Sequence, residues 1–155
     1  MPYFFTMKLE EEITQKQFKN EYHKAGVNLI FTYNWFIAFQ TSFLKPHNVT
    51  IQQYNILRIL RGQHPNPATI KLIRERMLDK MSDASRIVEK LRVKGLVDRK
   101  ICASDRRNVD VCITQEGLDL LAEVDRHQDE IDEKMSSLNP EEARALNDLL
   151  DKLRG

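Results

Sequence analysis

The feature that most constrains the fold is a change of hydrophobic periodicity near residue 95. Ala84, Ile87, Val88 and Leu91 follow the i, i+3, i+4, i+7 spacing of one buried helix face. After Gly95, side chains alternate in character over 97–102 and again over 109–114, with a polar, turn-forming segment at 103–108 between them. We therefore predict a helix over about 81–94, followed by a two-stranded hairpin with a basic tip.

A two-stranded hairpin is marginally stable alone, so it must pack on helices. The sequence predicts a first long helix over about 14–45, ended by Pro46 and Asn48. Its apolar residues lie on more than one face, which predicts that a second subunit covers part of it. The fold class expected is mainly α, with helices before and after the hairpin.

Capping signals mark the remaining helices. Thr50 and Gln53 form a capping box at the start of a second helix, with Gly62 as its C-terminal stop. Asn66 followed by Pro67 predicts the start of a short helix that runs to about residue 76. Thr114 is expected to cap one long helix whose apolar stripe extends to residue 135, and a final helix opens at 139–142.

A short helix, a turn and a helix with a polar leading end form a helix-turn-helix arrangement. The second helix of such a unit contacts bases with its N-terminal residues. The alternative is a solvated helix face with no ligand. The predicted DNA-binding residues on this helix are Ser82, Asp83, Ser85, Arg86 and Lys90.

The hairpin favours DNA over that alternative. Arg106 and Arg107 adjoin at its tip, where a narrow basic finger can enter a minor groove. Arg99 and Lys100 on the adjoining strand are candidates for phosphate contacts. The alternative is that neighbouring aspartates only neutralise the tip. Charge distribution agrees with a polyanion-binding segment, because residues 71–107 carry 12 basic and 6 acidic side chains while residues 116–155 carry 5 and 12.

At this point the chain resembles the MarR (multiple antibiotic resistance regulator) family of winged-helix transcription factors. The resemblance rests on the serine-containing helix at 82–91, Lys-Gly-Leu-Val at 94–97, Asp-Arg-Arg at 105–107 and Ile-Thr-Gln-Glu-Gly at 113–117. It implies a single 155-residue winged helix-turn-helix chain with a two-stranded β-wing. Residues 49–115 would bind DNA, and residues 1–48 and 116–155 would form the helical dimerisation region. The stretch 77–81 is longer than the family's usual turn.

The same resemblance implies a transcriptional regulator that binds double-stranded DNA as a homodimer on a palindromic operator, by expectation a repressor. Arg106 or Arg107 would enter the minor groove, with Asp105 holding its neighbour in place. Similar proteins bind small aromatic or amphipathic effectors in a cleft. The residues expected to line such a pocket here are Tyr33, Trp35, Phe36 and Tyr54.

Other functions find less support in the sequence. No nucleophile set or phosphate loop is visible, so the chain is not expected to be an enzyme, and no cofactor is expected. The histidines are scattered, which predicts no metal site. Cys102 and Cys112 are expected to pack in the strands, and their role stays open. A protein-interaction module or a metal- or redox-sensing module on the same fold remains the alternative.

The composition predicts a globular chain in the cytoplasm with no membrane partner. Hydrophobic residues make up 41% and charged residues 30%, which separates the chain from disordered sequences. No apolar run approaches the roughly 20 residues that a membrane helix needs. The N-terminal residues lack the pattern of a signal peptide.

Overall fold

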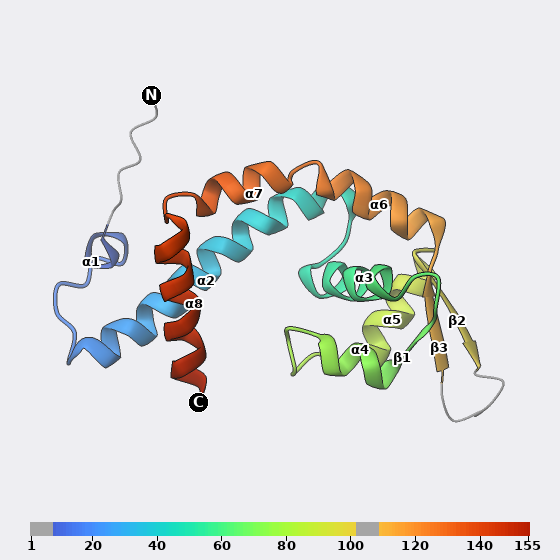
Figure 1. The fold of residues 1–155 in the computed structure, drawn as a ribbon, viewed down its shortest axis with the longest axis horizontal. Coiled ribbons are helices and arrows are strands. Elements are labelled where there is room, and N and C mark those ends of the chain that lie inside the picture. The colour runs from blue at the N-terminus through green and yellow to red at the C-terminus, as the bar shows by residue number, and fades with distance from the viewer. Residues whose placement is uncertain (1–7, 102–108) are drawn as a thin grey trace. The chain divides into compact units, whose positions relative to one another are not determined.

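The computed structural model describes residues 8–101 and 109–155, and it divides the chain into two compact units, residues 1–41 and 42–155. The described elements are α1 (Leu9–Glu12), α2 (Glu21–Leu44), a 3₁₀ turn η1 (Lys45–His47), α3 (Ile51–Gln63), β1 (Ala68–Thr69), α4 (Ile70–Arg76), α5 (Ala84–Val93), β2 (Val97–Ile101), β3 (Val109–Ile113), α6 (Gln115–Asp125), α7 (Gln128–Met135) and α8 (Pro140–Arg154). Figure 1 shows helices throughout and one small sheet, so the expected mainly α class is confirmed.

The first unit contains α1 and most of α2. The prediction that the long helix begins near Thr14 is wrong, because Thr14 has a φ of 53° and the helix starts at Glu21. Asn20 marks this start, since its side-chain oxygen accepts a hydrogen bond from the backbone N–H of His23 at 2.9 Å. Lys24 of α2 pairs with Glu10 of α1. The hydrogen bond from Lys24 lowers the pKa of the Glu10 carboxyl.

The second unit is built around a three-stranded antiparallel sheet with the strand order β1-β3-β2. Val97 pairs with Ile113 and Ile101 pairs with Val109, so the predicted hairpin is confirmed. Strand β1 was not predicted from the sequence; in it, Ala68 pairs with Val111 and Thr69 with Asp110. The Asn66 start is also wrong. Thr69 caps α4 by accepting a hydrogen bond from the backbone N–H of Leu72.

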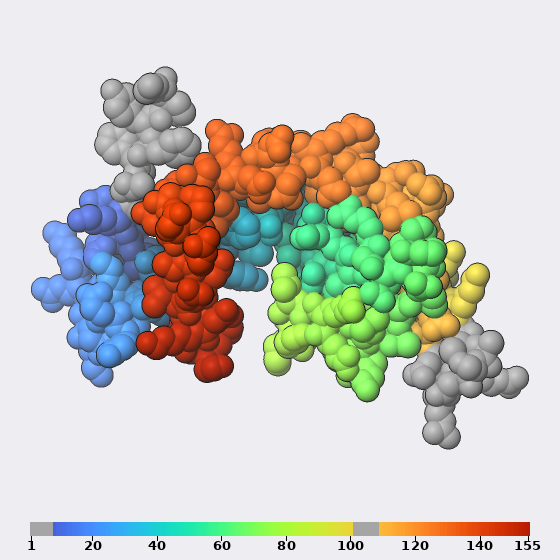
Figure 2. All heavy atoms as spheres, viewed as in Figure 1, coloured from blue at the N-terminus to red at the C-terminus, as the bar shows by residue number. Residues whose placement is uncertain are grey.

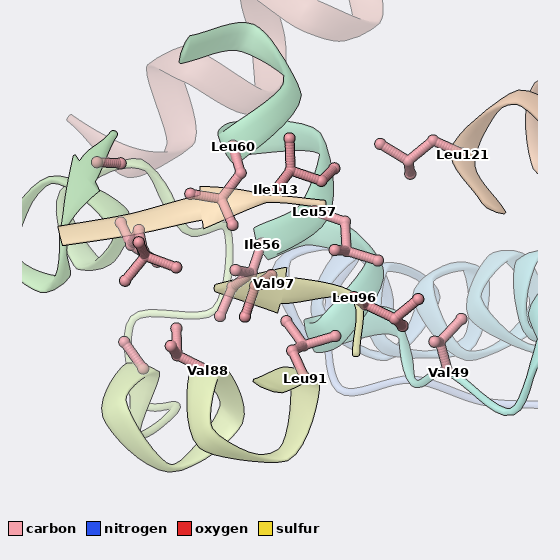
Figure 3. Packing of buried hydrophobic residues seen from close by; sticks show 14 of the residues in the cluster. Val49, Ile56, Leu57, Leu60, Val88, Leu91, Leu96, Val97, Ile113 and Leu121 are labelled. Atoms are coloured by element: carbon pink, nitrogen blue, oxygen red, sulfur yellow. The ribbon is translucent and has the colours of Figure 1, made fainter. Parts of the chain in front are cut away.

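One hydrophobic core joins this sheet to the helices of the second unit. Figure 3 shows Ile56 of α3 beside Val97 of β2, with Val88 and Leu91 directed from α5 toward them. All four side chains are at most 1% exposed. Of the four residues predicted for this helix face, Ala84, Val88 and Leu91 are buried, and Ile87 is half-buried and packs against the core. α6 also packs against α3, and the space-filling view shows their surfaces meeting without a gap (Figure 2).

The segment after β3 is two helices and not the one long helix expected. Thr114 caps α6 as predicted, but the chain turns at Arg126 and His127 before α7 begins. The ring of His127 stacks on that of Phe43, with centroids 4.6 Å apart. Asn139 and Glu142 form a capping box at the start of α8, so the predicted opening of the last helix is confirmed.

Lys94 ties α5 to the start of α3. Its ammonium group donates hydrogen bonds to the backbone carbonyl of Asn48 and to Oε1 of Gln53, the latter at 3.0 Å. Gln53 is 4% exposed, and the same oxygen accepts the backbone N–H of Thr50 in the capping box. The buried amide oxygen of Gln53 therefore accepts two hydrogen bonds. The contact fixes the C-terminal end of α5 relative to α3.

Candidate nucleic-acid interface

The helix expected to read DNA begins later than the sequence predicted. α5 starts at Ala84, and Asp83 is its N-cap, with a carboxylate oxygen accepting the backbone N–H of Arg86 at 3.1 Å. Ser82 and Asp83 therefore precede the helix. The Asp83 carboxylate satisfies a backbone donor that would otherwise lack a partner in the helix.

The loop before α5 is held by Asp79. Its carboxylate accepts the hydroxyl of Ser82 at 2.6 Å and the backbone N–H of Met81 at 3.0 Å. These hydrogen bonds, the one from Ser82 first, lower the pKa of the Asp79 carboxyl. The backbone N–H of Leu78 also donates to Oδ1 of Asn55 on α3, at 3.0 Å. The long turn between α4 and α5 is therefore braced at both ends.

The exposed side of α5 has two flanks that differ in charge. On the first flank, Arg86 and Lys90 are exposed. They help line a shallow pocket of about 260 Å³ between the N-terminal ends of α3 and α5. Its other lining residues are Thr50, Gln52, Gln53, Ser82, Asp83 and Ile87. Over residues 8–101 and 109–155, no acidic side chain forms an ion pair with Arg86 or Lys90.

On the second flank, Glu89 occupies two arginines. Its carboxylate accepts Nε and Nη2 of Arg92, the latter at 2.8 Å, and lies 3.5 Å from Nη1 of Arg99 on β2. The hydrogen bonds from Arg92 are the main cause of the lowered pKa of the Glu89 carboxyl. Arg99, predicted from the sequence as a phosphate ligand, is thus already paired with a carboxylate.

The remaining predicted DNA-binding residues lie on or near the same two elements. Ser85 is exposed in the first turn of α5, and Lys100 is exposed on β2 opposite Asp110 of β3. Asp105, Arg106 and Arg107 lie outside the described residues, as does Cys102. Within the described chain, α5 and β2 are brought together by the Glu89–Arg99 contact, so the helix and the strand leading to the hairpin tip form one surface.

Comparison with known proteins shows which family this region is similar to. Residues 47–108 match the sequence profile of the MarR family. Over 108 residues the chain is 29% identical to the HTH-type transcriptional regulator MhqR of Bacillus subtilis, covering 69% of this chain and 73% of MhqR. Residues 47–108 of the chain therefore match the MarR family, as the sequence resemblance predicted. Members of this family are transcription regulators, so the expectation that this chain is not an enzyme is confirmed.

Two solved structures share the fold of this chain. The S. aureus MepR–DNA complex has a TM-score of 0.73 and 20% identity, and covers 88% of this chain and 97% of MepR. The organohalide-sensing regulator RdhR, in its 2,4-dichlorophenol-bound form, has a TM-score of 0.78 and 19% identity, and covers 99% of this chain and 88% of RdhR. At these identities the likeness establishes the winged-helix fold.

The residues predicted to line an effector pocket belong to different units of the chain. Tyr33, Trp35 and Phe36 lie on α2 in the first unit, where Tyr33 is 61% and Trp35 43% exposed. Tyr54 lies on α3 in the second unit and packs against the core, with the guanidinium of Arg58 5.8 Å from its ring centroid.

The described residues give less support to a thiol site, a metal site or a membrane-spanning segment. Cys112 is a half-buried free thiol on β3. Residues 8–101 and 109–155 hold no group of three His, Cys, Asp or Glu side chains that could bind a metal ion. Among the helices described, none combines the length and the apolar character needed to cross a bilayer.

Sequence reasoning missed three residues of this surface. Glu89 and Arg92 fall at outer positions of α5, but their pairing with Arg99 depends on where β2 lies. Gln52 was not singled out because its place beside Ser82 depends on the packing of α3 against α5. The available signal was the position of Glu89 three residues before Arg92, which is typical of a helical ion pair.

Proposed function

We propose that this MarR-family regulator is a sequence-specific double-stranded-DNA-binding repressor that works in the cytoplasm as a homodimer on a palindromic operator. The observation that carries the proposal is the pair of exposed cations on α5, Arg86 and Lys90, which lack an acidic partner in the described part of the chain. Side chains placed this way can replace the counterions of a polyanion without first breaking an ion pair.

The position of each cation suggests its role. Arg86 lies in the first turn of α5, where a helix in the major groove contacts base edges, and its guanidinium can donate two hydrogen bonds to guanine. Lys90 lies one turn further along and is suited to phosphate. Ser82 and Ser85 supply hydroxyl groups near the leading end. That MepR, which shares the fold, was solved in complex with DNA supports DNA as the ligand.

The hairpin provides the second contact of the proposal. β2 and β3 are paired up to Ile101 and Val109, and residues 102–108 connect them. Arg106 or Arg107 in this connection would enter the minor groove, with Asp105 orienting its neighbour. Lys100, on the strand leading into the connection, would contact phosphates, while Arg99 beside it lies near them but is paired with Glu89.

Dimerisation is assigned to residues 1–48 and 116–155, and residues 49–115 form the winged DNA-binding region. Exposed apolar side chains in the terminal helices support this assignment. On α8, Leu149 is 64% and Leu153 66% exposed, and on α2, Tyr22 is 89% and Ile30 65% exposed. Exposed leucines on one helix face are typical of a surface that another helix covers. Two recognition helices about 34–36 Å apart would then match one turn of DNA.

The proposal also includes a small-molecule effector. Tyr33, Trp35, Phe36 and Tyr54 offer aromatic surface that suits a small aromatic or amphipathic compound, which would release the DNA. The 2,4-dichlorophenol-bound form of RdhR supports a ligand of this chemical class.

The test is a salt titration of DNA affinity. A duplex selected by the full-length protein from a random-sequence library is compared with a scrambled duplex by fluorescence anisotropy. We expect log affinity to fall linearly with log salt, and the selected duplex to bind more tightly. Arg86→Gln with Lys90→Gln should weaken binding and flatten the slope. The control Arg126→Gln with Lys152→Gln removes the same charge from α6–α8. Failure of the library to yield any bound duplex would refute the proposal.

A further inference from the structure

Glu89 is an acidic residue on the helix face assigned above to DNA. Its position lies on the side of α5 opposite the buried residues Ala84, Val88 and Leu91, and its side chain is 42% exposed. A carboxylate beside a phosphate backbone is repelled by it. The negative charge of Glu89 therefore opposes the proposed ligand. The side chains that Glu89 contacts suggest what its role is.

The partners of Glu89 are two arginines from different elements. Arg92 donates Nε at 3.0 Å and Nη2 at 2.8 Å, and these two donors make the pair bidentate. Arg99 belongs to β2, and its Nη1 lies 3.5 Å from Oε2, the carboxylate oxygen that also accepts Nε of Arg92. The lowered pKa of the Glu89 carboxyl agrees with a group that stays ionised in this arrangement.

Stability alone is a weak explanation for this cluster. The side chains of Glu89, Arg92 and Arg99 are 42%, 48% and 36% exposed, and pairs in contact with water contribute little to folding. These ion pairs have a larger effect on DNA binding than on folding. Two arginines on the DNA-facing side are occupied, whereas Arg86 and Lys90 on the other flank have no acidic partner in the described chain.

We propose that Glu89 is a specificity-determining residue, which lowers the affinity of α5 and β2 for DNA of any sequence by neutralising Arg92 and Arg99. This inference rests on the proposed DNA-binding function. Non-specific binding comes almost entirely from phosphate contacts, so each withheld cation weakens it directly. Binding to the operator also uses base contacts from Arg86 and its neighbours, which Glu89 leaves intact. The ratio of the two affinities therefore rises.

The decisive variant is Glu89→Gln, which keeps the shape and removes the charge. Its affinity for a scrambled duplex and for the library-selected duplex is measured across a salt series. One added phosphate contact steepens the log–log slope by about 0.9, which near 0.1 M salt corresponds to several-fold tighter binding. We expect Glu89→Gln to bind the scrambled duplex about threefold to tenfold more tightly, to gain less on the selected duplex, and so to discriminate less between them.

Two further variants separate this effect from a change of net charge or a structural role. Glu123→Gln on α6 removes a carboxylate from a similar exposed pair, with Arg126 at 2.9 Å, and should leave both affinities unchanged. In an Arg99→Gln background, the gain from Glu89→Gln should shrink, because one of the two released cations is absent. A purely structural role for Glu89 would lower the melting temperature and both affinities without steepening the salt slope.

The outcomes separate the inference from the function on which it rests. If the wild-type protein binds no duplex, the proposed function is wrong, and this inference is wrong as well. If the wild type binds and Glu89→Gln changes both affinities by the same factor, or changes neither, only the role of Glu89 is overturned. A gain on the scrambled duplex that is equally large in Glu123→Gln would also overturn it.

Discussion

The hydroxyl of Thr114 donates a hydrogen bond to the backbone carbonyl of Gly95 at 2.8 Å and accepts one from the backbone N–H of Gly117 at 3.1 Å. Gly95 ends α5 with a φ of 73°, a left-handed conformation that glycine adopts without strain. One side chain therefore joins the end of α5 to the start of α6. Two motifs that resemble the MarR pattern, at 94–97 and 113–117, are parts of one junction.

Replacing Thr114 by valine should destabilise the second unit by about 1–2 kcal/mol. Valine keeps the branched shape but cannot cap α6 or satisfy the Gly95 carbonyl. The measurement is urea unfolding followed by circular dichroism. Thr32→Val is the control, because Thr32 is an exposed threonine within α2. Equal effects of the two substitutions would show that the junction adds nothing to stability.

Gly117→Ala should destabilise the fold, although it adds only one methyl group. A Cβ atom at this position would lie 2.4 Å from the carbonyl oxygen of Leu96 and 2.7 Å from Cγ1 of Ile113. Backbone must shift to relieve such a clash, so we expect a loss of about 1–3 kcal/mol. Gly62→Ala is the matched control, since nothing lies within 4 Å of a Cβ there and alanine favours the helix. Its melting temperature should rise slightly while that of Gly117→Ala falls.

The parts of the fold that could be predicted are those set by neighbouring residues. The caps at Thr50, Thr114 and Asn139 each join two residues that are three positions apart, and all three are present. The buried face of α5 follows from helical spacing in the same way. Local rules sufficed for these elements because each cap or face satisfies its own backbone or burial requirement.

The errors arose where distant residues decide the structure. β1 has two residues, too few for any periodicity, and it exists because β3 offers its free edge about forty residues later. The start of α4 then moves to Thr69. In the site, Arg86 could be placed on an exposed face from sequence, but the Glu89–Arg99 pair could not, because it depends on the approach of β2 to α5.

Titration of Asp79 offers a test of the loop before α5. Its carboxyl pKa is lowered below 3.8, first by the hydrogen bond from Ser82. A lowered pKa in the folded state means that the carboxylate stabilises the fold above the ordinary value, and that this contribution is lost as pH falls through the lowered pKa. Carbon-13 NMR should place the midpoint below the ordinary value for aspartate and move it upward in Ser82→Ala. An unmoved midpoint would contradict the assigned role of Ser82.

Replacing Arg86 should affect DNA binding differently from replacing Arg106 and Arg107. Arg86→Ala should cost about 1–3 kcal/mol of discrimination at one base pair, because a bidentate contact to guanine is lost. Arg106→Ala with Arg107→Ala should weaken binding to every duplex and flatten the salt slope. Affinities are measured for the library-selected duplex and its single-base variants. If both proteins lose affinity by the same factor on every duplex, the division between base and backbone contacts is wrong.

The proposed dimer predicts that charges on the leucine face of α8 separate the subunits. Leu149 and Leu153 are both about two-thirds exposed and lie on the same face of the helix. Leu149→Glu with Leu153→Glu should shift the protein from dimer to monomer in sedimentation equilibrium at micromolar concentration, because two carboxylates would have to be desolvated at the interface. Operator affinity should fall with it, since two linked half-site contacts become one.

The matched control for α8 is Arg144→Glu, which makes the same change in net charge on the opposite face of the helix and should leave the dimer intact. A wild-type protein that sediments as a monomer at micromolar concentration would exclude the homodimer altogether. A double glutamate variant that remains dimeric would instead place the interface away from the leucine face. In that case the exposed apolar side chains of α2 become the surface to test next, beginning with Ile30→Glu.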